Sequence, residues 1–290
     1  IRMQKVLCWR VKMNNIMGVS ISSPDKVLYP NDGLTKLDVV KYYDKAADFM
    51  LPFIKNRPLA VIRCHDNIEN GFFKKHPTTE RDSVNTFFDG DEEYFYVKSK
   101  KDIIFQAQMG TIEFHIWGSK YPKIDQPDSM VFDLDPGEDI SLERLREGVR
   151  DLKNALTELC LEAFLKTSGG KGYHVVVPFK KSKGWDTFSS FSKKVAELLE
   201  VQFPKKYTTN IRKNQRHGKI FVDYLRNTRG ATCVAPFSLR ARNGAPISVP
   251  IAWRDLDKVA PSQITLKNIS KKVLASEVWA GFGLTGQFLR

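Results

Sequence analysis

The sequence contains few cysteines, no long apolar run and no low-complexity segment. Its cysteines lie far apart and none forms a Cys-x-x-Cys pair, so neither a zinc site nor a disulfide framework is expected; they are Cys8, Cys64, Cys160 and Cys233. A reducing, cytoplasmic compartment is the simplest interpretation. The absence of a long apolar run excludes a membrane-spanning helix, and residues 1–20 lack the apolar core of a signal peptide.

Acidic residues are scarce in one long segment. The 290-residue chain carries a net charge of +13, and residues 201–242 contain ten Lys or Arg residues but one acid, Asp223. Such a basic block indicates a polyanionic partner, most often nucleic acid. A solvated surface that only keeps the protein soluble is the alternative, and the single acid within the block favours a functional role.

Strand and helix patterns follow one another without strict alternation. This predicts an α+β fold with mixed or antiparallel sheets and flanking helices. Helices are expected from Thr35, where Asp38 completes a capping box, from near Ser141, and over residues 186–200. The expected strands are residues 59–64, 94–97, 103–106, 111–117, 131–135, 163–167, 173–179, 220–225 and 232–238. We divide the chain into an unassigned extension, residues 1–20, and one domain, residues 21–290, with a candidate internal boundary near residues 118–128.

The stretch VFDLDPG, residues 131–137, contains two aspartates among apolar neighbours. On a strand, Asp133 and Asp135 point to the same face, where like charges repel unless a cation lies between them. Carboxylate oxygens suit Mg²⁺ or Mn²⁺, although two solvated aspartates at a strand edge are the plainer alternative. IFVDYL, residues 220–225, adds Asp223, and three carboxylates suit a two-metal site for displacement at a phosphate. An ion pair with a neighbouring arginine is the alternative role for Asp223.

A glycine-rich loop, TSGGKGYHVVVP, precedes another expected strand. Glycines let backbone N–H groups approach phosphate oxygens, and Ser, Lys and His side chains add donors. The glycine spacing is not that of a Walker loop, and a tight hairpin is the alternative. The candidate phosphate-binding residues are Ser168, Gly169, Lys171, Gly172 and His174.

Other charged residues have candidate roles as well. Arg240 and Arg242, in SLRAR, would share one side of a continuing strand and could neutralise a triphosphate. His115 shares a strand face with Glu113 and is ambiguous, because a lone histidine on a strand is usually structural.

Two further pairs could contact nucleic acid. Lys26 and Lys36 flank the PNDG turn, and two lysines at a helix N-terminus suit a terminal phosphate. Two merely exposed lysines are the better explanation on chemistry alone. Phe72 and Phe73, next to Lys74, would suit stacking on unpaired bases if exposed.

Together these stretches resemble the polymerase domain of bacterial DNA ligase D and its stand-alone archaeal relatives, in the archaeo-eukaryotic primase superfamily. The resemblance covers about residues 21–257, in order, through KVLYPNDGLTKLDVVKYY, FFKKH, TIEFHIW, VFDLDPG, TSGGKGYHVVVP, IFVDYLRNTRGATCVAPFSLRAR and VPIAWRDLD. Full ligase D chains also carry a ligase domain and often a nuclease domain. We therefore expect either an excised domain or a polymerase that works with a separate ligase.

The resemblance implies a template-directed DNA or RNA polymerase, a nucleotidyltransferase that fills gaps and extends broken ends in non-homologous end joining. It implies two divalent ions (Mn²⁺ or Mg²⁺), DNA ends or gapped DNA with a 5′-phosphate, rNTP or dNTP substrates with a preference for ribonucleotides, and Ku and a DNA ligase as partners. It also implies a cytoplasmic protein associated with the nucleoid.

Carried onto this chain, the resemblance makes Asp133, Asp135 and Asp223 the catalytic metal ligands. Its triphosphate contacts match Ser168, Lys171, His174 and Arg240, with His115 close by, and its 5′-phosphate lysines match Lys26 and Lys36. Its template-stacking rings match Phe72 and Phe73, and Arg63 and Arg216 match further template contacts.

Three rival functions remain open from the sequence. A replicative-type primase starts chains de novo, but such catalytic subunits usually carry a zinc cluster that the cysteine spacing here does not provide. A non-catalytic DNA-end-binding module would not need three carboxylates within strands. A metal-dependent nuclease would need no triphosphate-binding residues.

Overall fold

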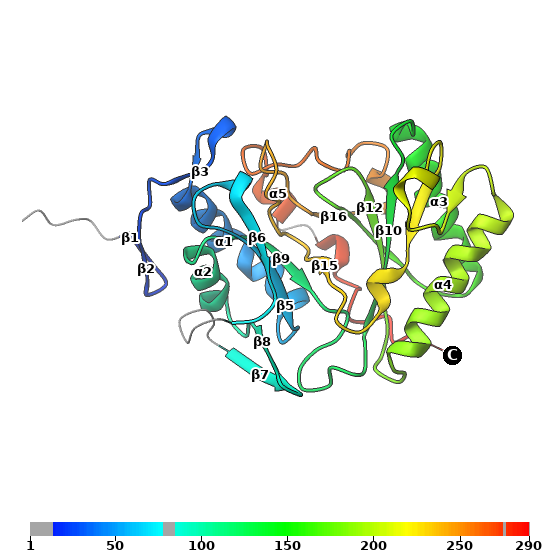
Figure 1. Ribbon diagram of the computed structural model, residues 1–290, viewed down its shortest axis with the longest axis horizontal. Coiled ribbons are helices and arrows are strands. Elements are labelled where there is room, and N and C mark those ends of the chain that lie inside the picture. The colour runs from blue at the N-terminus through cyan, green and yellow to red at the C-terminus, as the bar shows by residue number, and fades with distance from the viewer. Residues whose placement is uncertain (1–13, 78–84, 275–276, 290) are drawn as a thin grey trace, which may run out of the picture.

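The computed structural model describes residues 14–77, 85–274 and 277–289, and it confirms the α+β fold (Figure 1). The larger sheet has the strand order β13 (Tyr207–Thr208), β14 (Ile220–Asp223), β10 (Ser129–Pro136), β12 (Tyr173–Pro178), β11 (Phe164–Thr167), β16 (Pro250–Ile251). The smaller sheet has the order β15 (Cys233–Val234), β9 (Thr111–Ile116), β5 (Leu59–Cys64), β6 (Gly71–Lys74). Among these neighbours only β13 and β14 run parallel.

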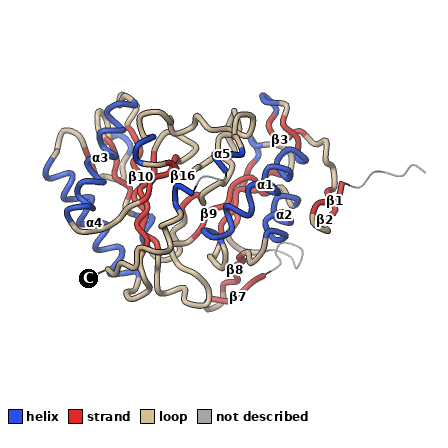
Figure 2. Tube along the Cα trace, turned by 180° about the vertical axis from the view of Figure 1, so that it is seen from behind, coloured by secondary structure: helices blue, strands red, loops and turns tan. Residues whose placement is uncertain are grey.

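Short strand pairs and helices surround the two sheets. The pairs are β1 (Asn14–Ile16) with β2 (Val19–Ile21), β3 (Val27–Tyr29) with β4 (Leu34–Thr35), and β7 (Asn85–Asp89) with β8 (Glu92–Tyr96). Helices α1 (Lys36–Ile54) and α2 (Lys100–Gln108) lie beside the smaller sheet, whereas α3 (Leu142–Glu158) and α4 (Trp185–Gln202) lie beside the larger one (Figures 1 and 2). The short α5 (Lys271–Leu274) belongs to the C-terminal segment.

Two expected helix starts are confirmed by their caps. The Thr35 side chain accepts a hydrogen bond from the Asp38 N–H at 3.3 Å, and Asp38 Oδ2 accepts one from the Thr35 N–H at 2.8 Å. Ser141 caps α3 by accepting a hydrogen bond from the Arg144 N–H at 3.2 Å. These bonds satisfy backbone donors that the first turn of a helix leaves unpaired.

Both sheets contribute to one continuous apolar core. Phe132 and Leu134 of β10 are 0 % exposed, whereas the side chains of Asp133 and Asp135 between them are 19 % and 48 % exposed. The alternation expected for residues 131–135 is therefore confirmed, and it directs the two carboxylates away from the core.

Three segments differ from the sequence expectation. Residues 103–106 lie in α2 rather than in a strand, because Ser99 and Asp102 form a capping box that starts a helix there. Of residues 232–238, only Cys233 and Val234 pair as a strand, since the backbone turns away with a left-handed φ of 64° at Phe237. Strand β9 is buried on both faces, so Glu113 is also enclosed.

The connector at residues 118–128 joins β9 of the smaller sheet to β10 of the larger one. The two sheets share the core described above, and Val19 and Ile21 of the first hairpin are buried in it as well. In the described ranges, no helix combines the length and apolar character needed to cross a bilayer.

Candidate active site

The expected metal ligands come from neighbouring strands in the middle of the larger sheet. Strands β10 and β14 are antiparallel, and their register sets Asp133 directly opposite Asp223. Asp135 lies two residues further along β10, and Asp133 and Asp135 both line a cavity of about 400 Å³. Strand pairing therefore brings the third aspartate to the first two from a distant part of the chain.

Neighbouring charges act strongly on these carboxylates. Burial by itself raises the pKa of Asp133, but the charge on His174 and its hydrogen bond outweigh burial and lower that pKa to about 2. Burial and the charge of Asp133 raise the pKa of Asp135. The same two causes raise the pKa of Asp223, although Arg226 Nε lies 3.1 Å from Asp223 Oδ2 and opposes them.

This donor set fits a divalent cation by its chemistry. Among the residues that the structure describes, no three acidic, imidazole or thiol side chains converge closely enough to hold an ion. Asp133 pairs with His174 and Asp223 pairs with Arg226. Burial and then the charge of Asp133 raise the pKa of Asp135 and Asp223, and a bound cation would oppose both effects by favouring the ionised carboxylates. Carboxylate oxygens are the ligands that Mg²⁺ and Mn²⁺ prefer.

Arg216, which the resemblance assigns to the template, lies at this acidic end of the cavity. Its Nη1 is 3.8 Å from Asp135 Oδ2, and its guanidinium is 3.6 Å from the centre of the Phe221 ring. The side chain is stacked and ion-paired, so any contact with a template would be made beside Asp135.

The row of residues that contains Asp133 continues across the sheet. Asp133 lies opposite His174 on β12, and His174 lies opposite Lys166 on β11. His174 Nε2 is 3.4 Å from Asp133 Oδ1, and its Nδ1 is 2.9 Å from Cys233 Sγ of the smaller sheet. Lys166 Nζ donates to Ser248 Oγ at 2.7 Å, and burial lowers the pKa of Lys166 to about 8. His174 is thus held in place between the two sheets.

The glycine-rich loop between β11 and β12 borders the same cavity. Ser168 Oγ accepts hydrogen bonds from the N–H groups of Gly170 at 3.0 Å and Gly172 at 3.2 Å. A Cβ at Gly172 would lie 2.2 Å from a backbone oxygen of β10, and Gly169 has a left-handed φ of 67°. Ser168, Gly172 and the exposed Lys171 line the cavity together with Asp133 and Asp135, whereas Gly169 is buried and does not line it.

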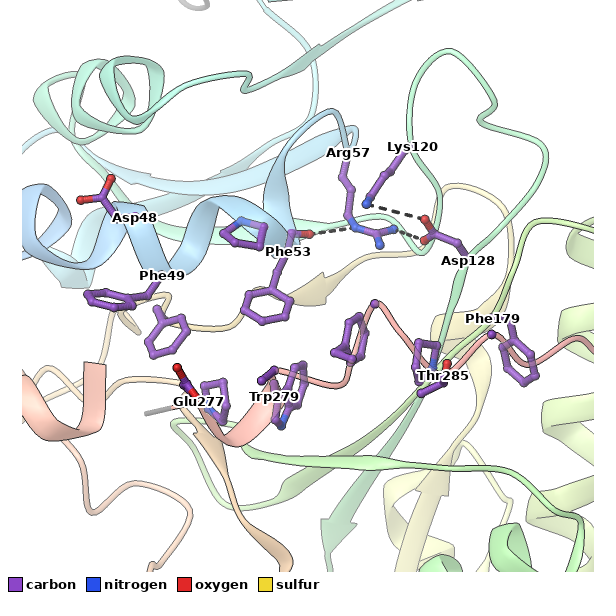
Figure 3. Close-up of a pocket in the computed structure, with 18 of the residues that line it drawn as sticks. Asp48, Phe49, Phe53, Arg57, Lys120, Asp128, Phe179, Glu277, Trp279 and Thr285 are labelled. Carbon is purple, nitrogen blue, oxygen red and sulfur yellow. Dashed lines mark hydrogen bonds and ion pairs between the residues drawn. The ribbon is translucent and has the colours of Figure 1, made fainter. Parts of the chain in front are cut away.

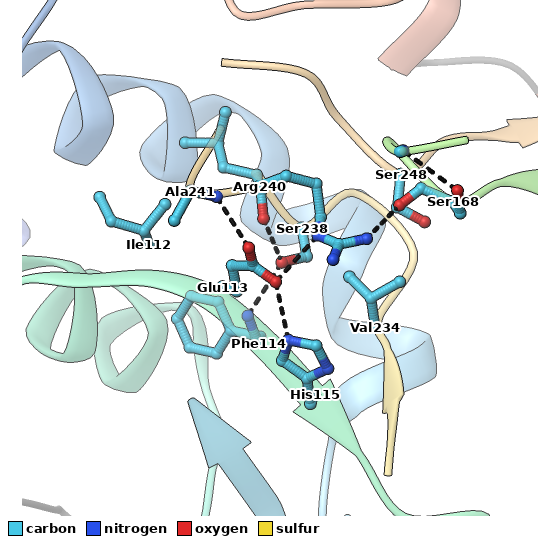
Figure 4. Close-up of polar contacts among 12 residues, drawn as sticks. Ile112, Glu113, Phe114, His115, Ser168, Val234, Ser238, Arg240, Ala241 and Ser248 are labelled. Atoms are coloured by element: carbon cyan, nitrogen blue, oxygen red, sulfur yellow. Dashed lines mark hydrogen bonds and ion pairs between the residues drawn. The ribbon is translucent and has the colours of Figure 1, made fainter. Parts of the chain in front are cut away.

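A buried carboxylate holds two other residues that line the cavity, His115 and Arg240 (Figure 4). Glu113 Oε2 accepts a hydrogen bond from Arg240 Nε at 2.8 Å and lies 2.8 Å from His115 Nε2. Burial opposes ionisation of Glu113, but the hydrogen bond from His115 and the charge of Arg240 outweigh it and lower the pKa of Glu113 to about 2. Arg240 and Arg242 both line the cavity, although they lie in a turn rather than in a continuing strand.

A second cavity, of about 650 Å³, lies between α1 and the C-terminal segment (Figure 3). Aromatic rings such as Phe53 and Trp279 line it, and Arg57 pairs with Asp128 at 2.6 Å at one end. It is the larger of the two cavities, but none of the residues expected to bind metal, nucleotide or DNA lines it. We therefore assign the candidate active site to the smaller, polar cavity.

The two lysines expected at a 5′-phosphate are neighbours at the N-terminus of α1. The Lys36 N–H donates to the Lys26 carbonyl at 2.8 Å across the β3–β4 hairpin. Burial and then the charge of Lys26 lower the pKa of Lys36 to about 8. Lys36 Nζ donates to the Ser22 carbonyl at 2.9 Å, and Lys26 Nζ pairs with Asp66 at 3.3 Å. Two adjacent cations at a helix N-terminus suit an anion.

Strand β6 forms an edge of the smaller sheet and carries the two expected stacking rings. Phe72 and Phe73 are 39 % and 48 % exposed, so both are accessible. Lys74 is only 9 % exposed and Arg63 only 2 %, and Arg63 Nη2 donates to Gln106 Oε1 at 3.0 Å in the interior. Both side chains are therefore largely buried, and a direct template contact by Arg63 or Lys74 stays a prediction.

The sequence expectation omits four residues that shape the site, namely Glu113, Lys166, Arg226 and Cys233. Glu113 and Lys166 are charged residues within apolar strands, and such residues need a partner when buried. The rule therefore marks Glu113 and Lys166 as candidates for a functional or structural role. It does not identify their partners, because Glu113 and Arg240, for example, are far apart in sequence and meet only in the fold.

Comparison with known families adds to this geometry. A family model described as the primase-polymerase domain of LigD matches residues 35–279. The chain is 34 % identical over 280 residues to a multifunctional non-homologous end joining protein LigD from Pseudomonas aeruginosa, covering 93 % of this chain and 33 % of that protein. It is 27 % identical to a bifunctional protein of the same name from Bacillus subtilis, over 88 % of this chain and 42 % of that one.

The fold is also similar to a solved structure. The polymerase domain of ligase D from Mycobacterium tuberculosis, in complex with DNA, matches with a TM-score of 0.80 and 30 % identity. The match covers 91 % of this chain and 95 % of that one. By contrast, the chain spans 33 % and 42 % of the two curated relatives, so it corresponds to one part of those longer proteins.

Proposed function

This chain belongs to the family of LigD primase-polymerase domains, and on that premise we propose that it is a template-directed nucleotidyltransferase. It would add nucleotides to the 3′-hydroxyl of a DNA strand. The observation that carries the proposal is the strand register that sets Asp133 opposite Asp223 and beside His174. Asp133 and His174 line a cavity whose other walls carry the phosphate-binding candidates Ser168 and Arg240, and Asp223 lies next to Asp133 on the neighbouring strand.

In this proposal each wall of the cavity has its own role. The triphosphate lies against the Ser168–Gly172 loop, where Lys171 and Arg240 supply donors and positive charge and His115 lies close by. Asp133, Asp135 and Asp223 would hold two divalent ions, Mn²⁺ or Mg²⁺, which when bound activate the attacking hydroxyl and stabilise charge on the transferred phosphoryl group.

We propose that the DNA is a gapped duplex or a broken end with a 5′-phosphate, and that the reaction serves non-homologous end joining, as the names of the relatives state for those proteins. The adjacent Lys26 and Lys36 support phosphate recognition, and the exposed rings of Phe72 and Phe73 support base stacking. We also propose that the protein prefers ribonucleotides, works with Ku and a DNA ligase, and lies in the cytoplasm at the nucleoid.

A primer-extension assay tests the proposal. The substrate is a gapped duplex with a labelled primer, supplied with rNTPs or dNTPs and with Mg²⁺ or Mn²⁺. We expect templated addition, which Asp133→Ala reduces on the order of a hundredfold or more, because metal-assisted charge stabilisation contributes several kcal/mol and each 1.4 kcal/mol is about tenfold.

The control is Glu197→Ala, which removes an exposed carboxylate of α4 that pairs with Lys193. It should leave extension unchanged. Failure of the wild-type protein to add any nucleotide with either metal, while it binds the duplex, would overturn the proposed activity. Release of nucleotides instead of addition would indicate a nuclease.

A further inference from the structure

We propose that Glu113 is a positioning residue for the nucleotide, fixing Arg240 and His115 so that the two sheets present one preformed triphosphate pocket. This inference rests on the proposed function of the cavity. Glu113 belongs to β9 of the smaller sheet, whereas Ser168 follows β11 of the larger sheet. The guanidinium of Arg240 connects these two residues directly (Figure 4).

Arg240 is held at two separate nitrogens. Its Nε donates to Glu113 Oε2 at 2.8 Å, and its Nη1 donates to the Ser168 carbonyl at 2.6 Å. One anchor lies in β9 of the smaller sheet and the other directly follows β11 of the larger sheet, so together they fix the plane of the guanidinium. Within the described part of the chain they leave Nη2 for a ligand. A planar guanidinium fixed in this way can approach a phosphate with two donors aligned and little entropy left to lose.

Glu113 also fixes His115. The 2.8 Å contact between Glu113 Oε2 and His115 Nε2 requires the proton of the neutral ring to be on Nε2, because an ionised carboxylate only accepts. His115 Nδ1 is then an acceptor, which can receive a hydrogen bond from a hydroxyl group of the nucleotide but cannot donate to a phosphate. The His115 ring is also packed edge-on against the exposed Phe73, with ring centres 5.9 Å apart. The network of Glu113 thus extends from the glycine-rich loop to the edge strand.

The burial of Glu113 supports a role beyond stability. The residue is 5 % exposed, so a ligand in the cavity would touch its partners rather than Glu113 itself. Its second oxygen accepts a hydrogen bond from the Ala241 N–H at 2.8 Å, which fixes the backbone between Arg240 and Arg242. All three hydrogen bonds to the carboxylate therefore act on residues at or beside the cavity wall, and removing the charge leaves these donors without their shared acceptor.

The test is Glu113→Gln, which keeps the side-chain volume but replaces one acceptor oxygen with an NH₂ group. We expect the Kd for a ribonucleoside triphosphate, measured by calorimetry with Mn²⁺, to rise about tenfold to a hundredfold, the usual effect of losing a charged hydrogen bond. In extension assays the KM for nucleotide should rise by a similar factor while kcat at saturation changes less. Affinity for DNA should not change.

Asp128→Asn is the matched control. Asp128 belongs to a second enclosed carboxylate–arginine pair, 2.6 Å from Arg57, at the aromatic cavity. It should lower the melting temperature as Glu113→Gln does, yet leave the nucleotide Kd unchanged. If both variants weaken nucleotide binding equally, the cause is a general loss of stability and the positioning role is overturned. The positioning role is also overturned if Glu113→Gln binds nucleotide with the same Kd as the wild-type protein.

Arg240→Lys provides a second, independent variant. A lysine keeps the charge but offers one ammonium group, so it cannot bond to Glu113 and Ser168 in the fixed planar geometry of arginine. We expect Glu113→Gln to weaken nucleotide binding little further in the Arg240→Lys background, because the two changes break one network. Additive effects would overturn the proposal. If the wild-type protein binds nucleotide but does not extend primers, the proposed polymerase function is wrong, whereas the positioning role of Glu113 is still tested by the nucleotide Kd.

Discussion

Lys36 is a largely buried lysine whose charge changes within an accessible pH range. Burial, and then the charge of Lys26, lower its pKa to about 8. Below pH 8 the ammonium is charged and can bind a phosphate, whereas above pH 8 the free protein loses that charge. A 5′-phosphate is fully ionised above about pH 7, since its second pKa is about 6. Any change in phosphate binding above pH 8 therefore reflects the protein.

We expect the preference for a 5′-phosphorylated gap over a 5′-hydroxyl gap to fall as the pH rises from about 7 to 9.5. The measurement is the ratio of the two Kd values by fluorescence anisotropy at each pH. Lys36→Met should abolish both the preference and its pH dependence. Lys100→Met is the control, because hydrogen bonding to Asp48 raises the pKa of Lys100 and it stays charged throughout. A preference that stays constant to pH 9.5 would contradict the role of Lys36.

At the residue scale, sequence reasoning succeeded where the rule is local. The alternation of a strand placed Asp133 and Asp135 on one face, and the structure confirms that direction. No such rule gives the burial of Arg63, which follows from a strand that is covered on both faces. The contact between Glu113 and Arg240 depends on how distant segments pair, and no local pattern contains that information.

At the element scale, α1 and α2 begin with the same kind of cap, but only α1 was predicted as a helix from the sequence. Thr35 and Asp38 precede a long amphipathic pattern, so the helix was predictable. Ser99 and Asp102 form the same box, but the apolar residues that follow them are few. A short apolar run cannot be assigned to strand or helix by periodicity alone, which explains the wrong strand at residues 103–106.

The two capping boxes provide a matched pair of variants. Thr35→Ala and Ser99→Ala should each lower the free energy of unfolding by about 1 kcal/mol, the usual cost of losing such a cap, as measured by urea denaturation. Only Thr35→Ala should also weaken the preference for a 5′-phosphate, because Lys36 is the first residue of α1. Equal loss of this preference in Ser99→Ala would show that the phosphate is not bound at the N-terminus of α1.

At the scale of the whole molecule, the candidate site exists because two sheets face each other. One provides the aspartates, His174 and the glycine-rich loop, while the other provides Glu113, His115 and Cys233. The sequence predicted the fold class and most strands, but the strand order β13-β14-β10-β12-β11-β16 follows from long-range pairing that alternation does not encode. The excess of positive charge was, in contrast, readable directly from composition.

The basic segment at residues 201–242 comes close to the acidic end of the cavity. The Gly137 N–H, two residues after Asp135, donates to the Lys219 carbonyl at 3.0 Å, and Arg212 in the same loop is exposed. We expect DNA affinity to fall steeply as the salt concentration rises. The double variant Arg212→Ala with Lys219→Ala should reduce the slope of log K against log[salt] by about 0.9 for each phosphate that the loop no longer neutralises. Lys193→Ala with Lys194→Ala, on the exposed face of α4, should leave the slope unchanged. Anisotropy titrations between about 50 and 200 mM salt measure both, and equal slopes for the two double variants would exclude this loop from the DNA-binding surface.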